Sequence, residues 1–191
     1  VGASDKIYLI KFDGGPLMTP RHVGTIGVGA TGPNSIDTST IQIPWSGLGE
    51  SVALNGTGTL LVAGTPNTYD VQWNSYYSRY DIAFGADGTQ DVGSVQMFTF
   101  SDTNFSSPSH IGTIGRGYAS IGGKRDMNAS VGRWYDLGKY DYYGDRFGTS
   151  VALNEDGTVL AVGGPGRPAT PFSTTDLGHN GSVKIIKFAS P

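Results

Sequence analysis

The strongest constraint in this sequence is an internal repeat. Three seven-residue segments recur at a constant spacing of 88 residues: 6–12 (KIYLIKF), 94–100 (SVQMFTF) and 182–188 (SVKIIKF). A second segment, HVGTIG at 22–27, returns at the same spacing as HIGTIG at 110–115. A repeat of this kind predicts one supersecondary unit that is used more than once and stacks on its own copies.

A second pair of segments recurs at a spacing of 99 residues. GESVALN at 49–55 matches GTSVALN at 148–154, and TLLVAG at 59–64 matches TVLAVG at 158–163. The change of spacing predicts loops of unequal length between the strands. All these segments are short, apolar or alternating, and bounded by Gly, Pro, Asn and Asp, which is typical of strands. The Asn-Gly and Asp-Gly turns inside each pair predict hairpins.

The order of the segments predicts an unfinished architecture. We number SVALN, LLVAG, SVQMFTF and HIGTIG as strands 1 to 4, so the chain reads 3-4, 1-2-3-4, 1-2-3. No stretch has a convincing helical period. The predicted fold class is all-β, with antiparallel four-stranded, propeller-like blades in an incomplete propeller of about two blades, since closed propellers have at least four. The first repeat spans 1–93 and the second 94–191, and we expect one continuous structural domain.

One family shows the same pattern. Residues 147–165 followed by 181–188 resemble the FG-GAP repeat of integrin-α-like β-propellers, with Phe147-Gly148 as the opening and Gly163-Gly164-Pro165 as the closing turn. In the first copy, Leu48-Gly49 and Gly64-Thr65-Pro66 stand in these places. The resemblance implies one four-stranded blade per repeat, arranged radially, and often a calcium site in the turn between strands 1 and 2.

Composition excludes several classes of function. Charged residues make up 15% of the chain and the net charge is −3, so no basic field attracts nucleic acid. The absence of cysteine excludes disulfides and thiolate metal sites. No apolar run approaches the ~18 residues of a membrane span. No histidine lies in a metal or nucleophile motif, so we expect no enzyme, no catalytic residue and no cofactor.

Calcium is the one cofactor that the resemblance raises. Asn154 and Asp156 align with ligand positions of the family's turn, but Ala152 and Leu160 stand where the outer acids belong. An ordinary hairpin turn is the favoured interpretation. A looser acidic group in the long loop leaves a metal site open, but a solvated loop or an aromatic contact surface is the favoured interpretation. The acidic group consists of Asp126, Asp136, Asp141 and Asp145.

Asn-x-Ser/Thr sequences are the strongest chemical signal. They occur at Asn55, Asn104, Asn128 and Asn180, all in predicted loops. Because a glycan is bulky and must face solvent, loop placement favours N-linked glycans and an extracellular or cell-surface location. The alternative is that these are simply good turn sequences.

Candidate interface residues come from two sources. Val23 and Ile26, in the N-terminal strand 4, are predicted to complete the blade of another copy by head-to-tail strand exchange. Aromatic residues of the three long insertions predict a contact surface or, alternatively, cover for blade edges. They are Trp45, Trp73, Trp134, Tyr76, Tyr77, Tyr142 and Tyr143.

These features together predict an extracellular structural protein. It is a subunit of a glycosylated surface filament or matrix, whose partners are copies of itself. The alternative is an adhesion module, a segment of a larger β-propeller that recognises a carbohydrate or protein through its aromatic loops.

Overall fold

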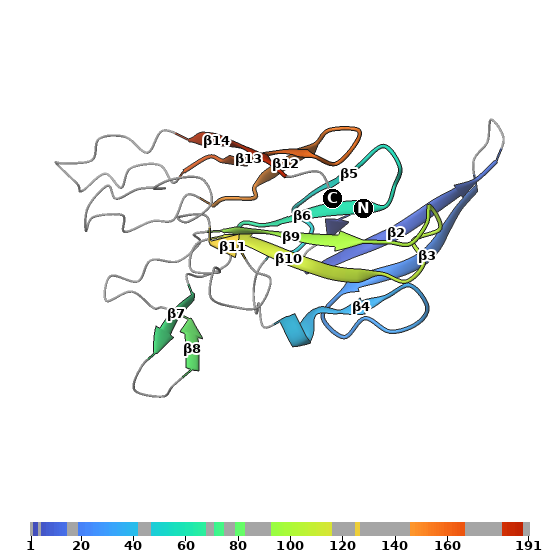
Figure 1. The fold of residues 1–191 in the computed structure, drawn as a ribbon. Coiled ribbons are helices and arrows are strands. Elements are labelled where there is room, and N and C mark those ends of the chain that lie inside the picture. Colours follow the sequence, from blue (N-terminus) through green and yellow to red (C-terminus); the bar gives the residue numbers. More distant parts are fainter. Residues whose placement is uncertain are drawn as a thin grey trace.

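The fold is all-β, as the sequence predicts. The computed structural model describes residues 2–3, 5–14, 19–41, 47–67, 71–74, 79–82, 93–115, 125–126, 146–166 and 181–188. Within these ranges the only helical element is one 3-10 turn, η1 (Thr38–Ile41). Figure 1 shows three stacked sheets and one separate hairpin.

The central sheet contains all four repeat strands in succession. They are β5 (Ser51–Leu54), β6 (Leu60–Thr65), β9 (Ser94–Thr99) and β10 (Ser109–Gly115). Neighbouring strands are antiparallel, in the order β10-β9-β6-β5. The predicted order of strands 1 to 4 is therefore confirmed. Because β6 pairs with β9, both repeats contribute to this one sheet.

The first sheet holds the N-terminal strand pair. β2 (Lys6–Asp13) and β3 (Thr19–Gly27) are antiparallel and occupy the places of strands 3 and 4. The short strand β1 (Gly2–Ala3) pairs with the start of β2, where Gly2 lies opposite Ile7. In the central sheet, Gly64 of β6 lies opposite Val95 in the matching position. Thus β1 occupies the place of the end of strand 2.

The last sheet has three strands. β12 (Ser150–Leu153), β13 (Val159–Gly164) and β14 (Ser182–Lys187) are antiparallel in the order 1-2-3. Among the described residues no strand pairs with the outer edge of β14. In the central sheet, β10 pairs with the equivalent edge of β9.

Three features go beyond the sequence-based expectations. Strand 4 is followed by a two-residue parallel strand in both cases, namely β4 (Ile36–Asp37) beside β3 and β11 (Arg125–Asp126) beside β10. β3 and β10 each carry a bulge, at repeat-equivalent positions 23 and 111. The insertion after β6 contains a separate hairpin. It is formed by β7 (Val71–Asn74) and β8 (Arg79–Ile82).

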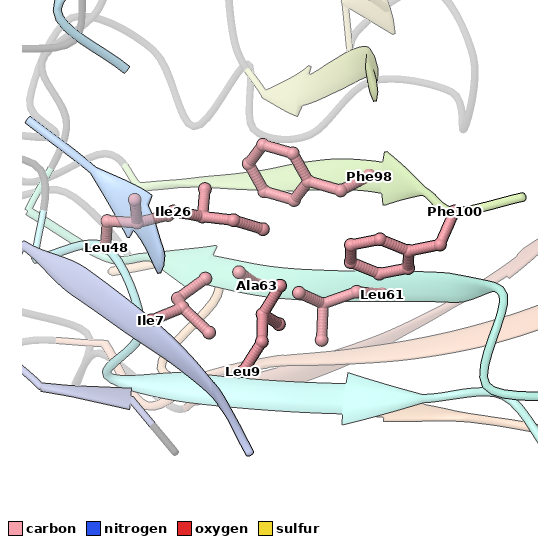
Figure 2. Close-up of a cluster of buried hydrophobic side chains, with 8 residues drawn as sticks. All are labelled: Ile7, Leu9, Ile26, Leu48, Leu61, Ala63, Phe98 and Phe100. Atoms are coloured by element: carbon pink, nitrogen blue, oxygen red, sulfur yellow. The ribbon is translucent and has the colours of Figure 1, made fainter. Parts of the chain in front are cut away.

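A first core joins the first sheet to the central sheet. Side chains of β2 and β3 pack there against alternate side chains of β6 and β9 (Figure 2). Its buried members are Ile7, Leu9, Ile26, Leu48, Leu61, Ala63, Phe98 and Phe100.

A second core lies on the opposite face of the central sheet and joins it to the last sheet. Its buried members are Val62, Val95, Ile114, Phe147, Leu160, Val162 and Ile186. The two cores use the same repeat positions: Val95 stands 88 residues after Ile7, and Leu160 stands 99 residues after Leu61. Further matched pairs are Ile26 and Ile114, Leu48 and Phe147, Ala63 and Val162, and Phe98 and Ile186. One rule of sheet-on-sheet packing is therefore applied twice.

The central and last sheets approach most closely beside their first strands. Gly56 N donates to Glu155 O at 2.8 Å, from one strand 1-2 turn to the next. Ser51 Oγ donates to Gly148 O at 2.7 Å. A Cβ on Gly64 would lie 1.8 Å from that same carbonyl oxygen, so glycine is needed there for the backbones to approach. The described residues form a stack rather than a closed ring.

Candidate glycosylation and interface sites

Asn104 lies in the turn between β9 and β10, and its side chain is exposed. Asp102 organises this turn, because its Oδ1 accepts hydrogen bonds from Asn104 N at 2.8 Å and Ser106 N at 3.1 Å. These bonds, that of Ser106 first, hold the pKa of Asp102 below its ordinary value of 3.8. Asn104 Oδ1 accepts a hydrogen bond from Lys11 Nζ.

The rest of the Asn104 sequence is anchored to the protein. Phe105 has a positive φ of 60° and packs edge-on against Phe100, with ring centroids 5.0 Å apart. Ser106 O accepts a hydrogen bond from Ser101 N at 2.9 Å. The anchored turn presents Asn104 outward, which is the geometry that a glycan requires.

Asn55 is placed differently, because it is buried inside the turn between β5 and β6. Its Oδ1 accepts hydrogen bonds from Thr59 N and Leu60 N, both at 2.9 Å. Its Nδ2, the atom that a glycan would modify, donates to Thr57 Oγ1 at 2.9 Å. In this folded state Asn55 is a structural residue of the turn, which argues against a glycan there. Asn128 and Asn180 lie outside the described residues.

The turn between β12 and β13 uses its polar side chains in the same way. Asn154 Oδ1 accepts from Val159 N at 2.7 Å, and Asp156 Oδ1 accepts from Thr158 N at 2.9 Å and from Thr158 Oγ1 at 2.6 Å. The Thr158 hydroxyl and N–H lower the pKa of Asp156 from 3.8. These bonds describe a hairpin turn whose oxygens serve its own backbone.

Metal ligation has no further support in the described part of the chain, where no group of three or more His, Cys, Asp or Glu side chains gathers. Asp126 lies on β11, and nothing is described of its side chain. Asp136, Asp141 and Asp145 fall outside the described residues.

The two repeat-equivalent histidines contact polar side chains of their own sheet. His22 Nε2 lies 2.9 Å from Thr25 Oγ1, and His110 Nε2 lies 3.0 Å from Gln96 Oε1. Gln96 is buried and also accepts from Thr113 Oγ1 at 2.7 Å. His110 therefore belongs to a side-chain network between β9 and β10, whereas His22 is exposed and contacts its own strand.

The predicted interface residues of strand 4 pack in a core of their own chain. Ile26 is 0% exposed in the first core, and Val23 is half-buried against that core. While β3 keeps this place, neither side chain is available to another copy. Trp73 lies on β7, but its side chain is not described. The other aromatic candidates lie outside the described residues, namely Trp45, Trp134, Tyr76, Tyr77, Tyr142 and Tyr143.

Two rows of exposed apolar side chains were not predicted from the sequence. Val183 and Ile185, the β14 row, point away from the central sheet and are 67% and 63% exposed. On β2, Tyr8 and Phe12 are exposed and Ile10 is half-buried on the face turned away from the first core. We call these three the β2 row. The repeat could have identified the β14 row. Val183 occupies the position of Ile7 and Val95, and Ile185 occupies the position of Leu9 and Met97.

A third exposed apolar pair lies on β5. Val52 and Leu54 are exposed, whereas their repeat equivalents Val151 and Leu153 are half-buried against the second core. The difference follows from sheet composition. The first sheet has no full strands 1 and 2 among the described residues, and these are the strands that would cover β5.

Comparisons with protein-family models, curated proteins and solved structures find no significant match to this chain. Among the described residues no helix is long and apolar enough to cross a membrane.

Proposed function

We propose that this chain is an extracellular structural protein whose three sheets are propeller-type blades, and that it joins copies of itself head to tail. The observation that carries the proposal is the repeated stack with unfinished ends. Two sheet-to-sheet contacts within the chain follow one rule, and each end leaves apolar side chains in positions that the rule buries elsewhere. Contacts of one type that add in one direction produce rings or filaments.

The Asn-x-Ser/Thr sequences support the extracellular part of the proposal. Asn104 is exposed in a turn that is anchored on both sides, and it faces solvent as a glycan must. The proposed sites are Asn104, Asn128 and Asn180, and Asn55 is buried in its turn whereas Asn104 is exposed. No catalytic residue or cofactor belongs to this function.

Two measurements test the proposal. Electron microscopy and sedimentation of the purified chain should show regular rings or filaments, and a chain that stays monomeric at every concentration contradicts assembly. Intact mass of native material before and after N-glycosidase treatment should show sugar, and Asn104→Gln should remove the part attached at Asn104. An unmodified mass removes the argument for secretion.

An adhesion or recognition segment of a larger propeller is the second candidate. It is favoured by the close approach of β5 and β12, because the first strands of neighbouring blades lie close together around a propeller axis. This candidate expects a monomeric chain that binds a carbohydrate or protein partner. The sedimentation result therefore separates the two candidates.

A further inference from the structure

The β14 row stands in positions that the chain buries twice elsewhere. Ile7 and Leu9 of β2 lie in the first core, and Val95 of β9 lies in the second core with Met97 packed against it. Val183 and Ile185 follow at the same spacing of 88 residues, yet they are 67% and 63% exposed. A surface of this composition at the end of a repeated stack indicates a docking face.

The covering side of each contact is also repeated. In the first core, Phe98 and Phe100 of the central sheet lie against the β2 side chains, and in the second core Ile186 and Phe188 take their place. The equivalent positions of the first sheet are Ile10 and Phe12, which belong to the β2 row. Phe12 is exposed, so within the described part of the chain no other sheet packs on this face of the first sheet.

The two rows cannot meet within one chain. The first and last sheets lie on opposite faces of the central sheet, since Leu61 and Ala63 of β6 point into one core and Val62 into the other. The first and last sheets form the two ends of the stack in Figure 1, and each row lies on the face of its sheet away from the core. Contact between the two rows therefore requires two molecules.

We infer that the β14 row of one molecule docks face to face on the β2 row of a second copy, and that this contact continues the stacking rule of the two internal cores. The inference rests on the proposed assembly and specifies its surface. This contact takes the place of the strand donation by β3 that the sequence predicts, because Ile26 of β3 is fully buried in the first core of its own chain. Because the two rows differ, the contact is heterologous and leaves one row free at each end of a dimer.

Two single-surface variants test the inference. Variant X carries Val183→Lys and Ile185→Lys, and variant Y carries Phe12→Lys, so the two altered rows repel each other. All three side chains are exposed, so both variants should fold, as near-native circular dichroism and melting would show. Val28→Lys is the matched control, because Val28 is an exposed apolar residue outside both rows.

Sedimentation velocity between about 1 µM and about 1 mM, the range of weak association, gives the outcome. X alone and Y alone should remain monomeric, or associate at least about tenfold more weakly than the parent and Val28→Lys chains. A mixture of X and Y should form a 1:1 dimer and nothing larger, because X retains its β2 row and Y its β14 row.

The failures are distinguishable. If the parent assembles and X or Y assembles equally well, the docking face is wrong while the proposed assembly stands. If the mixture stays monomeric although the parent assembles, the pairing of these two rows is overturned. A monomeric parent contradicts the proposed assembly itself together with this inference.

Discussion

The central sheet and the last sheet share three repeat-equivalent strands but have different surroundings. The central sheet is covered on both faces, so Val95 on one side and Phe98 on the other are both fully buried. In the described part of the chain the last sheet is covered on one face, where Ile186 is buried, while Ile185 on its other face is exposed. Burial at a given repeat position is thus decided by a neighbouring sheet rather than by the strand itself.

The largest expected difference is between Val95→Asp and Val183→Asp. Val95 is 0% exposed, so an aspartate there places an unpaired charge in the second core and should cost about 3–5 kcal/mol, a large part of a domain's stability. Val183→Asp should change the free energy of unfolding by less than about 0.5 kcal/mol in dilute monomer. Urea denaturation measures both, and equal losses would refute the difference in cover.

The matched glycines of strand 2 test how closely the sheets approach. In Gly64→Ala the new Cβ meets the backbone oxygen of Gly148 at 1.8 Å, so the two sheets must move apart at a cost of about 3 kcal/mol. In Gly163→Ala the nearest atom is Ser150 Oγ at 2.2 Å, an exposed side chain that can rotate away. We expect this second change to cost below about 1 kcal/mol. A Gly64→Ala variant that melts with the parent chain would mean looser stacking.

Alanine substitutions at two repeat-equivalent serines should change the stability less than the glycine substitutions, and the two changes should differ from each other. Ser94 Oγ lies 2.5 Å from Thr65 Oγ1 and accepts from Gln96 Nε2 at 3.3 Å, so Ser94→Ala should destabilise by about 1–3 kcal/mol. Ser182 is its repeat equivalent, but Gly164 replaces the threonine, and Ser182 Oγ is buried with no hydrogen-bond partner in the described structure. Ser182→Ala should be neutral or slightly stabilising. Thermal melts of the two variants measure the difference. A lower melting temperature for Ser182→Ala than for Ser94→Ala would contradict this explanation.

The smallest expected effect is local and depends on pH. Thr158 lowers the pKa of Asp156 below 3.8, so the ionised carboxylate stabilises the last-sheet turn above pH 3.8 and this contribution is lost as pH falls through the lower, folded pKa. The central-sheet turn has Thr57 in this position and no such dependence. Amide exchange at Val159 should therefore accelerate in acid relative to Leu60. Asp156→Asn should remove the difference, and a parallel acid response of both turns would contradict it.

The repeat predicted the strands and their order because alternation, turn residues and spacing are local signals. SVALN, LLVAG, SVQMFTF and HIGTIG are β5, β6, β9 and β10 in a single sheet. The short parallel strands β4 and β11 carry two residues each, too few for a period to appear in the sequence.

The sites were harder to predict, since their exposure depends on tertiary structure. Asn55 and Asn104 share the same Asn-x-Ser/Thr pattern, yet one is buried in a turn and the other faces solvent. Val183 and Val95 share a repeat position, and only the presence of the neighbouring sheet distinguishes them. The strand order assigns Ile26 to an intermolecular contact because the last blade lacks a strand 4, and that order does not show that β3 packs in a core of its own chain.

An engineered disulfide tests the central claim, that repeat-equivalent sheets stack through equivalent faces with their first turns in contact. The chain has no cysteine, so Gly56→Cys with Glu155→Cys introduces a single possible pair. A Cβ built on Gly56 would lie 3.5 Å from Glu155 Cα and 2.5 Å from Glu155 Cγ, so the two side-chain positions are close enough for a disulfide. Under mild oxidation the dilute double variant should form an intramolecular disulfide of monomer mass, and in strong denaturant it should form far less. Two free thiols in the folded monomer, or crosslinks only between molecules, would contradict the stacked arrangement.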